Sequence, residues 1–233
     1  SYGHLHLSWD RFDADTAYRG VICSIATRFR IKGNEYLGGG LKAIYQIETG
    51  GIGVDEATTG LGGDLRNSFL GFTGTGWGTV KIGRHDTPYK DLGRRLDQFN
   101  EQIGDSRALN SVAGVFDVRA KNMVRYESPT FGGFNINALQ SSNNGDETTA
   151  ATQKVSSVGA NWSARPLFVG AAYEVHGIDP TGASTLFGIP ATAVTKKKET
   201  GTRLAASYKL GAFTIGASYD MFADLAGVDS LDV

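Results

Sequence analysis

The sequence predicts an all-β protein: a transmembrane antiparallel β-barrel with up-and-down topology. Eleven segments alternate apolar and polar residues with a period of two. Short glycine-rich turns and long polar loops alternate between these segments, as in barrels whose two rims differ. Glycine accounts for 32 of the 233 residues and aromatic residues for 10%. The sequence contains no run of about 18 apolar residues, which a membrane-spanning helix would need. The composition therefore favours strands joined by turns.

Each predicted strand has one apolar face. The second strand shows this most clearly, because Phe29 and Ile31 alternate with Arg28, Arg30 and Lys32. The predicted strands are residues 2–10, 24–32, 41–48, 65–74, 79–84, 121–128, 134–140, 155–162, 167–175, 202–210 and 212–219.

The connections fall into two classes by length. The predicted short turns are residues 33–40, 74–78, 129–133, 163–166 and 210–211, and the predicted long loops are 11–23, 49–64, 85–120, 141–154, 176–201 and a stretch from 220 onward. Within the longest loop, Leu92, Leu96, Phe99 and Ile103 recur at helical spacing. Since no linker or change of composition interrupts the chain, residues 1–233 are expected to form a single domain.

Aromatic residues recur on the apolar faces, mostly near strand ends. A barrel places such rings at the level of the lipid headgroups. We expect this lipid-facing girdle to comprise Trp9, Tyr45, Tyr126, Trp162, Tyr173, Tyr208 and Tyr219.

Three blocks of sequence resemble the general porins of the Gram-negative outer membrane, most closely the beta-proteobacterial branch. They are residues 28–43 (RFRIKGNEYLGGGLKA), the hairpin of residues 66–72 (RNSFLGF) and 78–84 (GTVKIGR), and residues 124–134 (VRYESPTFGGF). The resemblance implies a homotrimer of barrels of 16 strands, a number that leaves water in the lumen. It also implies an outer-membrane location among lipid and lipopolysaccharide, and a third loop, here residues 85–120, folded into the lumen.

The resemblance also implies which cations line the narrowest part of the channel. By motif position, Arg28, Arg66 and Arg125 fall on the family's row of arginines, and Arg30, Lys32 and Arg84 extend the same wall. Strand parity agrees for Arg28 and Arg125. Parity leaves Arg66 open, since outward-facing Leu70 and Phe72 would turn it outward and an outward-facing Phe69 would turn it inward.

Acidic residues of the folded-in loop are expected opposite these cations. Asp97 and Glu101 lie four residues apart, so on a helical turn they would share a face, and Asp105 follows them. The same loop carries Arg94, Arg95 and Arg107, which leaves the net sign of the constriction open.

The predicted function is passive diffusion of small hydrophilic solutes and ions, with a preference for anions. The sequence predicts no cofactor and no metal, since Cys23 is the single cysteine and His4 and His6 lack an evident third ligand. The net charge of −1 gives no general attraction to nucleic acid.

Two alternatives remain at this stage: a soluble all-β binding or structural module, and an outer-membrane barrel enzyme. The enzyme is disfavoured because the chain has neither a Gly-x-Ser-x-Gly motif nor a histidine near Cys23 in sequence.

The beginning and length of the chain suggest a processed and partial protein. No basic-then-apolar run opens the sequence, so we expect a mature chain whose signal peptide has been removed. At about 20 residues per strand, 16 strands would need roughly 320 residues. The sequence is therefore expected to be C-terminally incomplete.

Overall fold

The computed structural model describes residues 1–14, 17–24, 26–52, 65–101, 105, 116–142, 154–177 and 198–225, although not the side chains of 12–14, 17–19 and 21. Among these residues, no helix has the length and apolar character needed to cross a membrane.

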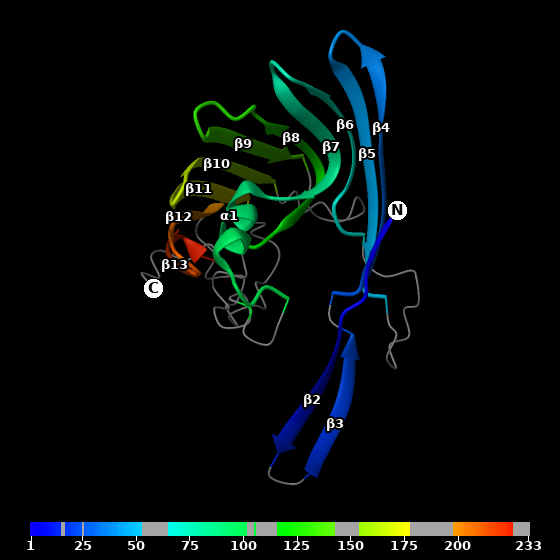
Figure 1. Ribbon diagram of the computed structural model, residues 1–233, viewed down its shortest axis with the longest axis vertical. Helices are drawn as coiled ribbons and strands as arrows, with labels where there is room; N and C mark the ends of the chain where they lie inside the picture. The colour runs from blue at the N-terminus through cyan, green and yellow to red at the C-terminus, as the bar shows by residue number, and fades with distance from the viewer. Residues whose placement is uncertain are drawn as a thin grey trace.

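One antiparallel sheet of 11 strands dominates the molecule and curves around a central space (Figure 1). Its strands are β1 (Tyr2–His4), β4 (Arg28–Gly38), β5 (Leu41–Gly50), β6 (Ser68–Gly74), β7 (Gly78–Asp86), β8 (Arg119–Glu127), β9 (Phe134–Ser141), β10 (Val155–Ala164), β11 (Leu167–Gly177), β12 (Lys198–Leu210) and β13 (Phe213–Ala223). From β4 onward every strand pairs with the next in chain order, and β1 pairs with β4. The predicted all-β, up-and-down architecture is confirmed.

A separate hairpin replaces the predicted loop of residues 11–23. β2 (Leu7–Ala14) and β3 (Ala17–Ser24) pair with each other from Leu7 opposite Ser24 to Ala14 opposite Ala17, and they project away from the main sheet (Figure 1). The prediction of a loop was wrong because a segment without regular alternation of apolar and polar residues can still satisfy its backbone hydrogen bonds by pairing with the strand before it.

The predicted first strand, residues 2–10, divides into β1 and β2. At the break, the backbone N–H of His6 donates to Oγ1 of Thr27 (3.2 Å), and that hydroxyl donates to the carbonyl oxygen of His6 (3.2 Å). The threonine side chain therefore takes the place of a strand partner where the chain leaves the main sheet.

The turn between β4 and β5 depends on three successive glycines. Gly38, Gly39 and Gly40 have φ values of 97°, 58° and 82°, a region that other residues enter at a cost. This turn sets the register that pairs Arg30 with Glu48.

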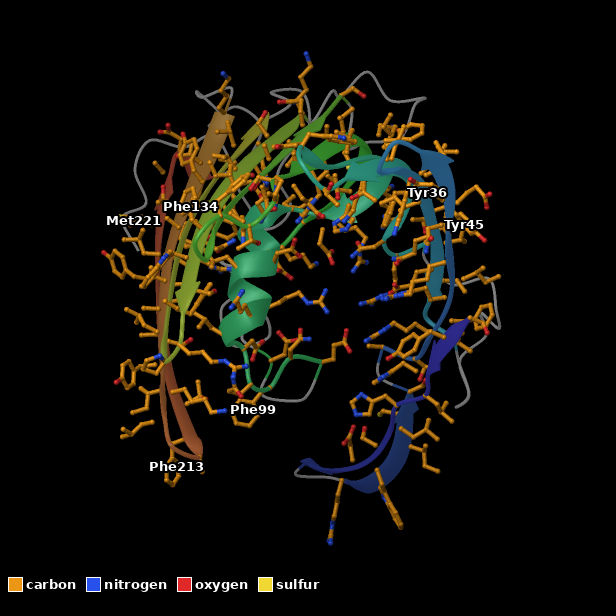
Figure 2. All side chains as sticks on the ribbon, turned by 45° about the horizontal axis from the view of Figure 1, so that its top comes forward. Tyr36, Tyr45, Phe99, Phe134, Phe213 and Met221 are labelled. Atoms are coloured by element: carbon orange, nitrogen blue, oxygen red, sulfur yellow. The ribbon has the colours of Figure 1, made fainter. Side chains whose placement is uncertain are left out.

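The convex side of the sheet is apolar and exposed. Figure 2 shows Tyr45, Phe134 and Phe213 pointing away from the central space. Phe29 and Ile31 are likewise exposed, whereas the side chain of Arg28, which precedes Phe29, reaches Glu101 on the concave side. Of the predicted girdle residues, Trp162 is half-buried and the others are exposed: Trp9, Tyr45, Tyr126, Tyr173, Tyr208 and Tyr219.

A short helix, α1 (Pro88–Leu96), lies on the concave side of the sheet (Figure 1). Thr87 caps its N-terminus by accepting the N–H of Lys90, and Pro88 occupies the first helical turn. The helix packs through Tyr89 and Leu92 on a buried apolar cluster of Phe116, Phe168, Ala172, Ala205 and Leu225. The predicted folding of the long loop into the lumen is thus observed for α1.

The helical spacing predicted over residues 89–103 holds only as far as Leu96. Asp97 is extended (φ −75°, ψ 105°), and its Oδ1 accepts the N–H of Phe99 (2.9 Å), which ends the helix with a turn. Asp97 and Glu101 therefore do not share a helical face, contrary to the prediction. Ile103 lies outside the described residues.

Candidate functional site

Glu48 on β5 lies at the centre of a group of arginines on the concave side of the sheet. Its side chain is buried. Arg30 Nε donates to Glu48 Oε2 over 2.6 Å, and Arg66 Nε donates to Oε1 over 2.8 Å. Arg28 Nε lies 3.9 Å from the same Oε1. One carboxylate of the sheet therefore faces three guanidinium groups.

Glu101, from the turn that follows α1, meets this group from the other side. Arg28 Nη1 donates to both of its carboxylate oxygens, over 2.7 Å and 2.9 Å. Arg66 Nη2 donates to Oε1 over 3.2 Å, and Arg94 Nη2 of α1 lies 3.6 Å from that oxygen. We call Arg28, Arg30, Arg66 and Arg94 the arginine cluster.

The conformation of Glu101 is held by a second carboxylate. Glu101 has a φ of 64°, which is unusual for a residue with a side chain. Its N–H donates to Oδ2 of the buried Asp105 (2.9 Å). Asp105 thus positions the turn through the backbone.

The charge environment of Glu101 favours its ionised form. Burial on its own would raise the pKa of the Glu101 carboxyl. The hydrogen bond from Arg28 and the charges of Arg28, Arg66 and Arg94 outweigh burial, so the pKa lies below the usual glutamate range. Glu101 is therefore a carboxylate at neutral pH.

Asp86, at the end of β7, is a further carboxylate that contacts several cations, among them Arg94 of the arginine cluster. It is fully buried and accepts Arg94 Nη1 (3.0 Å) and Asn67 Nδ2 (2.9 Å) through Oδ2. Arg119 Nε and Lys90 Nζ lie 3.0 Å and 3.6 Å from its Oδ1. Because Lys90 and Arg94 belong to α1, these contacts fix the helix to the sheet.

Arg125 of β8 lies beneath α1, away from the arginine cluster. Its guanidinium is buried, with Nη2 2.6 Å from Asp91 Oδ2 and Nε donating to Glu127 Oε1 over 2.8 Å. Nη1 also donates to the backbone carbonyl of Asp86. Arg125 therefore joins helix and sheet rather than standing beside Arg28 and Arg66.

The two-way prediction for Arg66 is resolved by an irregularity in strand pairing. Gln46 pairs with Phe69, whereas Thr49 pairs with Leu65. Three steps along β5 thus correspond to four steps along the segment that leads into β6, as in a β-bulge. Leu70 and Phe72 are exposed, yet the extra residue lets Arg66 face inward.

Lys32 and Arg84, which were also predicted for the channel wall, lie outside the arginine cluster. Lys32 is exposed and lines a cavity of about 450 Å³ with Lys81 and Gln46. Arg84 is half-buried opposite Ser68, and its Nε makes no hydrogen bond within the described part of the chain. The structure thus brings Arg28, Arg30, Arg66 and Glu101 together. Within the described residues, Arg84 and Arg125 form no ion pair with Glu48 or Glu101, and Asp97 accepts the N–H of Phe99 instead.

Glu48, Asp86 and Asp91 take part in these contacts although the sequence did not single them out. The sequence contained a signal for Glu48. The glycine turn of residues 38–40 joins β4 to β5, and the register that follows from this turn places Glu48 opposite Arg30. Asp86 and Asp91 find their partners through the docking of α1, which depends on tertiary packing.

The cluster leaves positive charge unbalanced at this point of the concave surface. Four guanidinium groups share the three carboxylates of Glu48, Glu101 and Asp86, since Arg94 pairs with both Glu101 and Asp86. Arginine stays protonated and offers several donors to a carboxylate or phosphate. The arrangement can attract small anions and place a fixed field across the space beside α1.

His4 and His6 lie close together near the N-terminus. The rings of His4 and His6 meet edge-on, with centroids 5.7 Å apart. Within the part of the chain that the structure describes, no group of three or more His, Cys, Asp or Glu side chains is placed to hold a metal ion.

Comparison with known proteins shows similarity to bacterial outer-membrane proteins. Residues 2–232 match the family described as Gram-negative porin. The major outer membrane protein P.IB of Neisseria gonorrhoeae is 33% identical over 114 residues, which span 48% of this chain and 31% of that protein. An outer membrane porin of Bordetella pertussis is 27% identical over 131 residues, 55% of this chain and 34% of its own. The chain thus matches about a third of the length of these relatives.

The fold is also similar to a solved structure. OmpT, an outer membrane protein of Vibrio cholerae, superposes with a TM-score of 0.63 at 18% identity, over 94% of this chain and 62% of OmpT. At this identity the likeness concerns the fold.

Proposed function

The chain belongs to the Gram-negative porin family and is an outer-membrane protein, and we propose that it forms a water-filled channel through which small hydrophilic solutes and ions diffuse passively, with a preference for anions. Family membership argues against the soluble binding or structural module considered from the sequence.

The proposed anion preference depends on the arginine cluster. Arg28 and Arg66 come from the sheet and Arg94 from α1, and all three converge on Glu101. Four guanidinium groups against the three carboxylates of Glu48, Glu101 and Asp86 leave an excess of positive charge beside the turn after α1. A ring of fixed charge of one sign selects ions of the other sign.

The opposed charges also support passage of polar over apolar solutes. Glu101 and the sheet arginines create a field that orients water and dipolar molecules. An apolar molecule gains nothing from this field in exchange for the water it displaces. We therefore propose that the cluster and Glu101 form the constriction, with Lys32 farther along the same wall.

The surroundings of the channel are part of the proposal. The exposed aromatic residues of the convex face, such as Tyr45, Tyr173 and Tyr219, would contact lipid at the interfaces, next to lipopolysaccharide. The comparisons also include OmpT of Vibrio cholerae in a trimer form (TM-score 0.63), which supports a homotrimer. A closed barrel of 16 strands remains the expectation for the whole protein.

Reversal potentials of the full-length protein in planar bilayers under a KCl gradient test this function. We expect anion preference in the wild-type protein and a smaller preference in Arg28→Gln and in Arg66→Gln. Arg165→Gln, which changes an exposed arginine in the turn between β10 and β11, is the matched control. A wild-type protein without ion current, or with equal selectivity in all variants, would contradict the proposal.

A further inference from the structure

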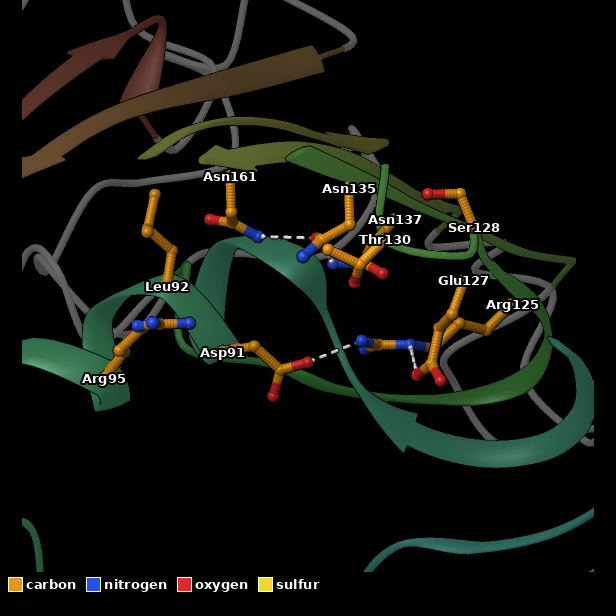
Figure 3. A pocket seen from close by; sticks show the side chains of 10 residues that line it. All are labelled: Asp91, Leu92, Arg95, Arg125, Glu127, Ser128, Thr130, Asn135, Asn137 and Asn161. Atoms are coloured by element: carbon orange, nitrogen blue, oxygen red, sulfur yellow. Dashed lines mark hydrogen bonds and ion pairs between the residues drawn. The ribbon is translucent and has the colours of Figure 1, made fainter. Parts of the chain in front are cut away.

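A second polar site lies on the inner wall beside α1. A pocket of about 340 Å³ opens between the helix and strands β8–β10, and its lining shares no residue with the arginine cluster (Figure 3). The volume is at the lower end of the range typical of small-molecule sites. We infer that this pocket binds a zwitterion of amino-acid size, a solute with separated charges and no net charge.

The pocket keeps two opposite charges of one helix apart. Asp91 and Arg95 are four residues apart on α1, a spacing that usually allows an ion pair. Here Asp91 pairs instead with Arg125 (2.6 Å). Arg95 stacks its guanidinium 3.8 Å from the centre of the Phe168 ring and donates to Ser163 Oγ (3.1 Å). Figure 3 shows Arg95 and Glu127 at opposite ends of the pocket.

The lining carries no net charge, in contrast to the arginine cluster. Among the lining residues, Asp91 and Glu127 balance Arg95 and Arg125, and Glu127 is also paired with Lys81 (2.7 Å), which lies outside the lining. The Arg125 side chain is only 4% exposed, whereas those of Asp91 and Glu127 are 37% and 27% exposed. Solvent at this end of the pocket therefore meets carboxylates, and solvent at the other end meets the exposed Arg95.

A row of asparagine amides connects the two ends. Asn135 and Asn137 lie on β9, and Asn161 lies opposite Asn135 on β10. The Nδ2 groups of Asn137 and Asn161 both donate to Asn135 Oδ1 over 3.3 Å. Within the described residues this leaves Oδ1 of Asn137 and of Asn161 to accept, and Nδ2 of Asn135 to donate, toward the pocket (Figure 3).

These groups match the two ends of a short zwitterion. An ammonium group would donate to Asp91, Glu127 and the asparagine carbonyls, and a carboxylate would accept from Arg95. Four residues of helix separate Asp91 from Arg95 by about 6 Å along the axis. Because the two side chains then extend in different directions, to Arg125 and to Phe168, their charged ends can span the roughly 8 Å that two hydrogen bonds of about 2.9 Å and the N–Cα–C path of an α-amino acid require.

L-alanine is the probe that tests this inference, which rests on the proposed channel for access from water. Calorimetry on the detergent-solubilised full-length protein should detect binding of L-alanine. Arg95→Gln should weaken it about tenfold, because a charge-assisted hydrogen bond is lost. Arg95→Lys should restore most of the affinity, and Arg165→Gln should leave it unchanged.

Xylitol and sodium acetate distinguish the other possible ligands. Xylitol binding as tight as L-alanine would show a site for neutral polyols, and acetate binding as tight would show a simple anion site. Either result, or an affinity for L-alanine unaffected by Arg95→Gln, overturns the inference. Ion conduction in KCl is measured separately, so a failure of the channel function is distinguishable from a failure of this site.

Discussion

Arg28 and Glu101 join the sheet to the turn after α1: a single guanidinium nitrogen, Nη1 of Arg28, donates to both carboxylate oxygens of Glu101, over 2.7 Å and 2.9 Å. The two residues are 73 positions apart in the chain. This contact holds the carboxylate of Glu101 within hydrogen-bonding distance of the arginine cluster.

Replacing Glu101 by glutamine should increase the anion preference. The substitution removes one of the carboxylates that offset the charge of the arginine cluster. A permeating ion about 4 Å from a unit charge interacts with it by about 1 kcal/mol in water. Losing that interaction should change the anion-to-cation permeability ratio about fivefold at low salt. Reversal potentials in KCl gradients measure this ratio, and the effect should shrink in 1 M salt because of screening. A decrease in anion preference would contradict the assignment of Glu101.

The contribution of Glu101 should persist to unusually low pH. Its pKa is held below the ordinary glutamate value of about 4.3. A lowered folded-state pKa means that the stabilising ion pairs are complete above the ordinary value and are lost as the pH falls through the lowered one. The difference in selectivity between wild type and Glu101→Gln should therefore stay constant from about pH 7 to 5 and vanish only below the ordinary pKa. A difference that already vanishes near pH 5 would show that Glu101 is not held as described.

Arg125→Gln should reduce stability more than selectivity. The variant removes the buried arginine from Asp91 and from Glu127, although Glu127 keeps its ion pair with Lys81 (2.7 Å). Removing one partner of a buried pair costs about 3–5 kcal/mol, and we expect about 2–3 kcal/mol because both carboxylates keep some contact with solvent. Thermal unfolding of the purified protein measures the loss. Arg28→Gln is the comparison, with the larger change expected in reversal potential.

A charge on the convex face should impair insertion into the membrane. Ile31 is exposed between Arg30 and Lys32 on β4, and lysine on a lipid-facing position destabilises a barrel by about 2–4 kcal/mol near the midplane. Ile31→Lys should lower the yield of folded protein in lipid vesicles. Gln46→Lys places the same charge on the concave side, so equal yields for the two variants would contradict the assigned facing.

Strand periodicity was enough to predict the main sheet. Each of the 11 predicted strands has a counterpart, since the alternation of residues such as Phe29 and Arg30 reflects two different surroundings. The β2–β3 hairpin was missed because β3 (AYRGVICS) has no regular alternation of apolar and polar residues. The end of α1 was missed because Asp97 stops the helix by bonding the N–H of Phe99, a local competition that apolar spacing does not report.

The site was only partly predictable for a different reason. Arg28, Arg66 and Glu101 were identified by motif position and acidity, and the structure brings them together. Asp97 was expected in the same place, but it caps the helix. Asp86 and Asp91 take their partners from a helix that docks on the sheet, and docking requires contacts between residues that are distant in sequence.

The irregular pairing ahead of β6 limits how this segment can be engineered. Thr49 pairs with Leu65, one residue out of step with Gln46 and Phe69. Deleting a single residue between Leu65 and Ser68 would restore regular alternation and turn the Arg66 guanidinium toward the hydrocarbon, while the downstream hairpin kept its orientation.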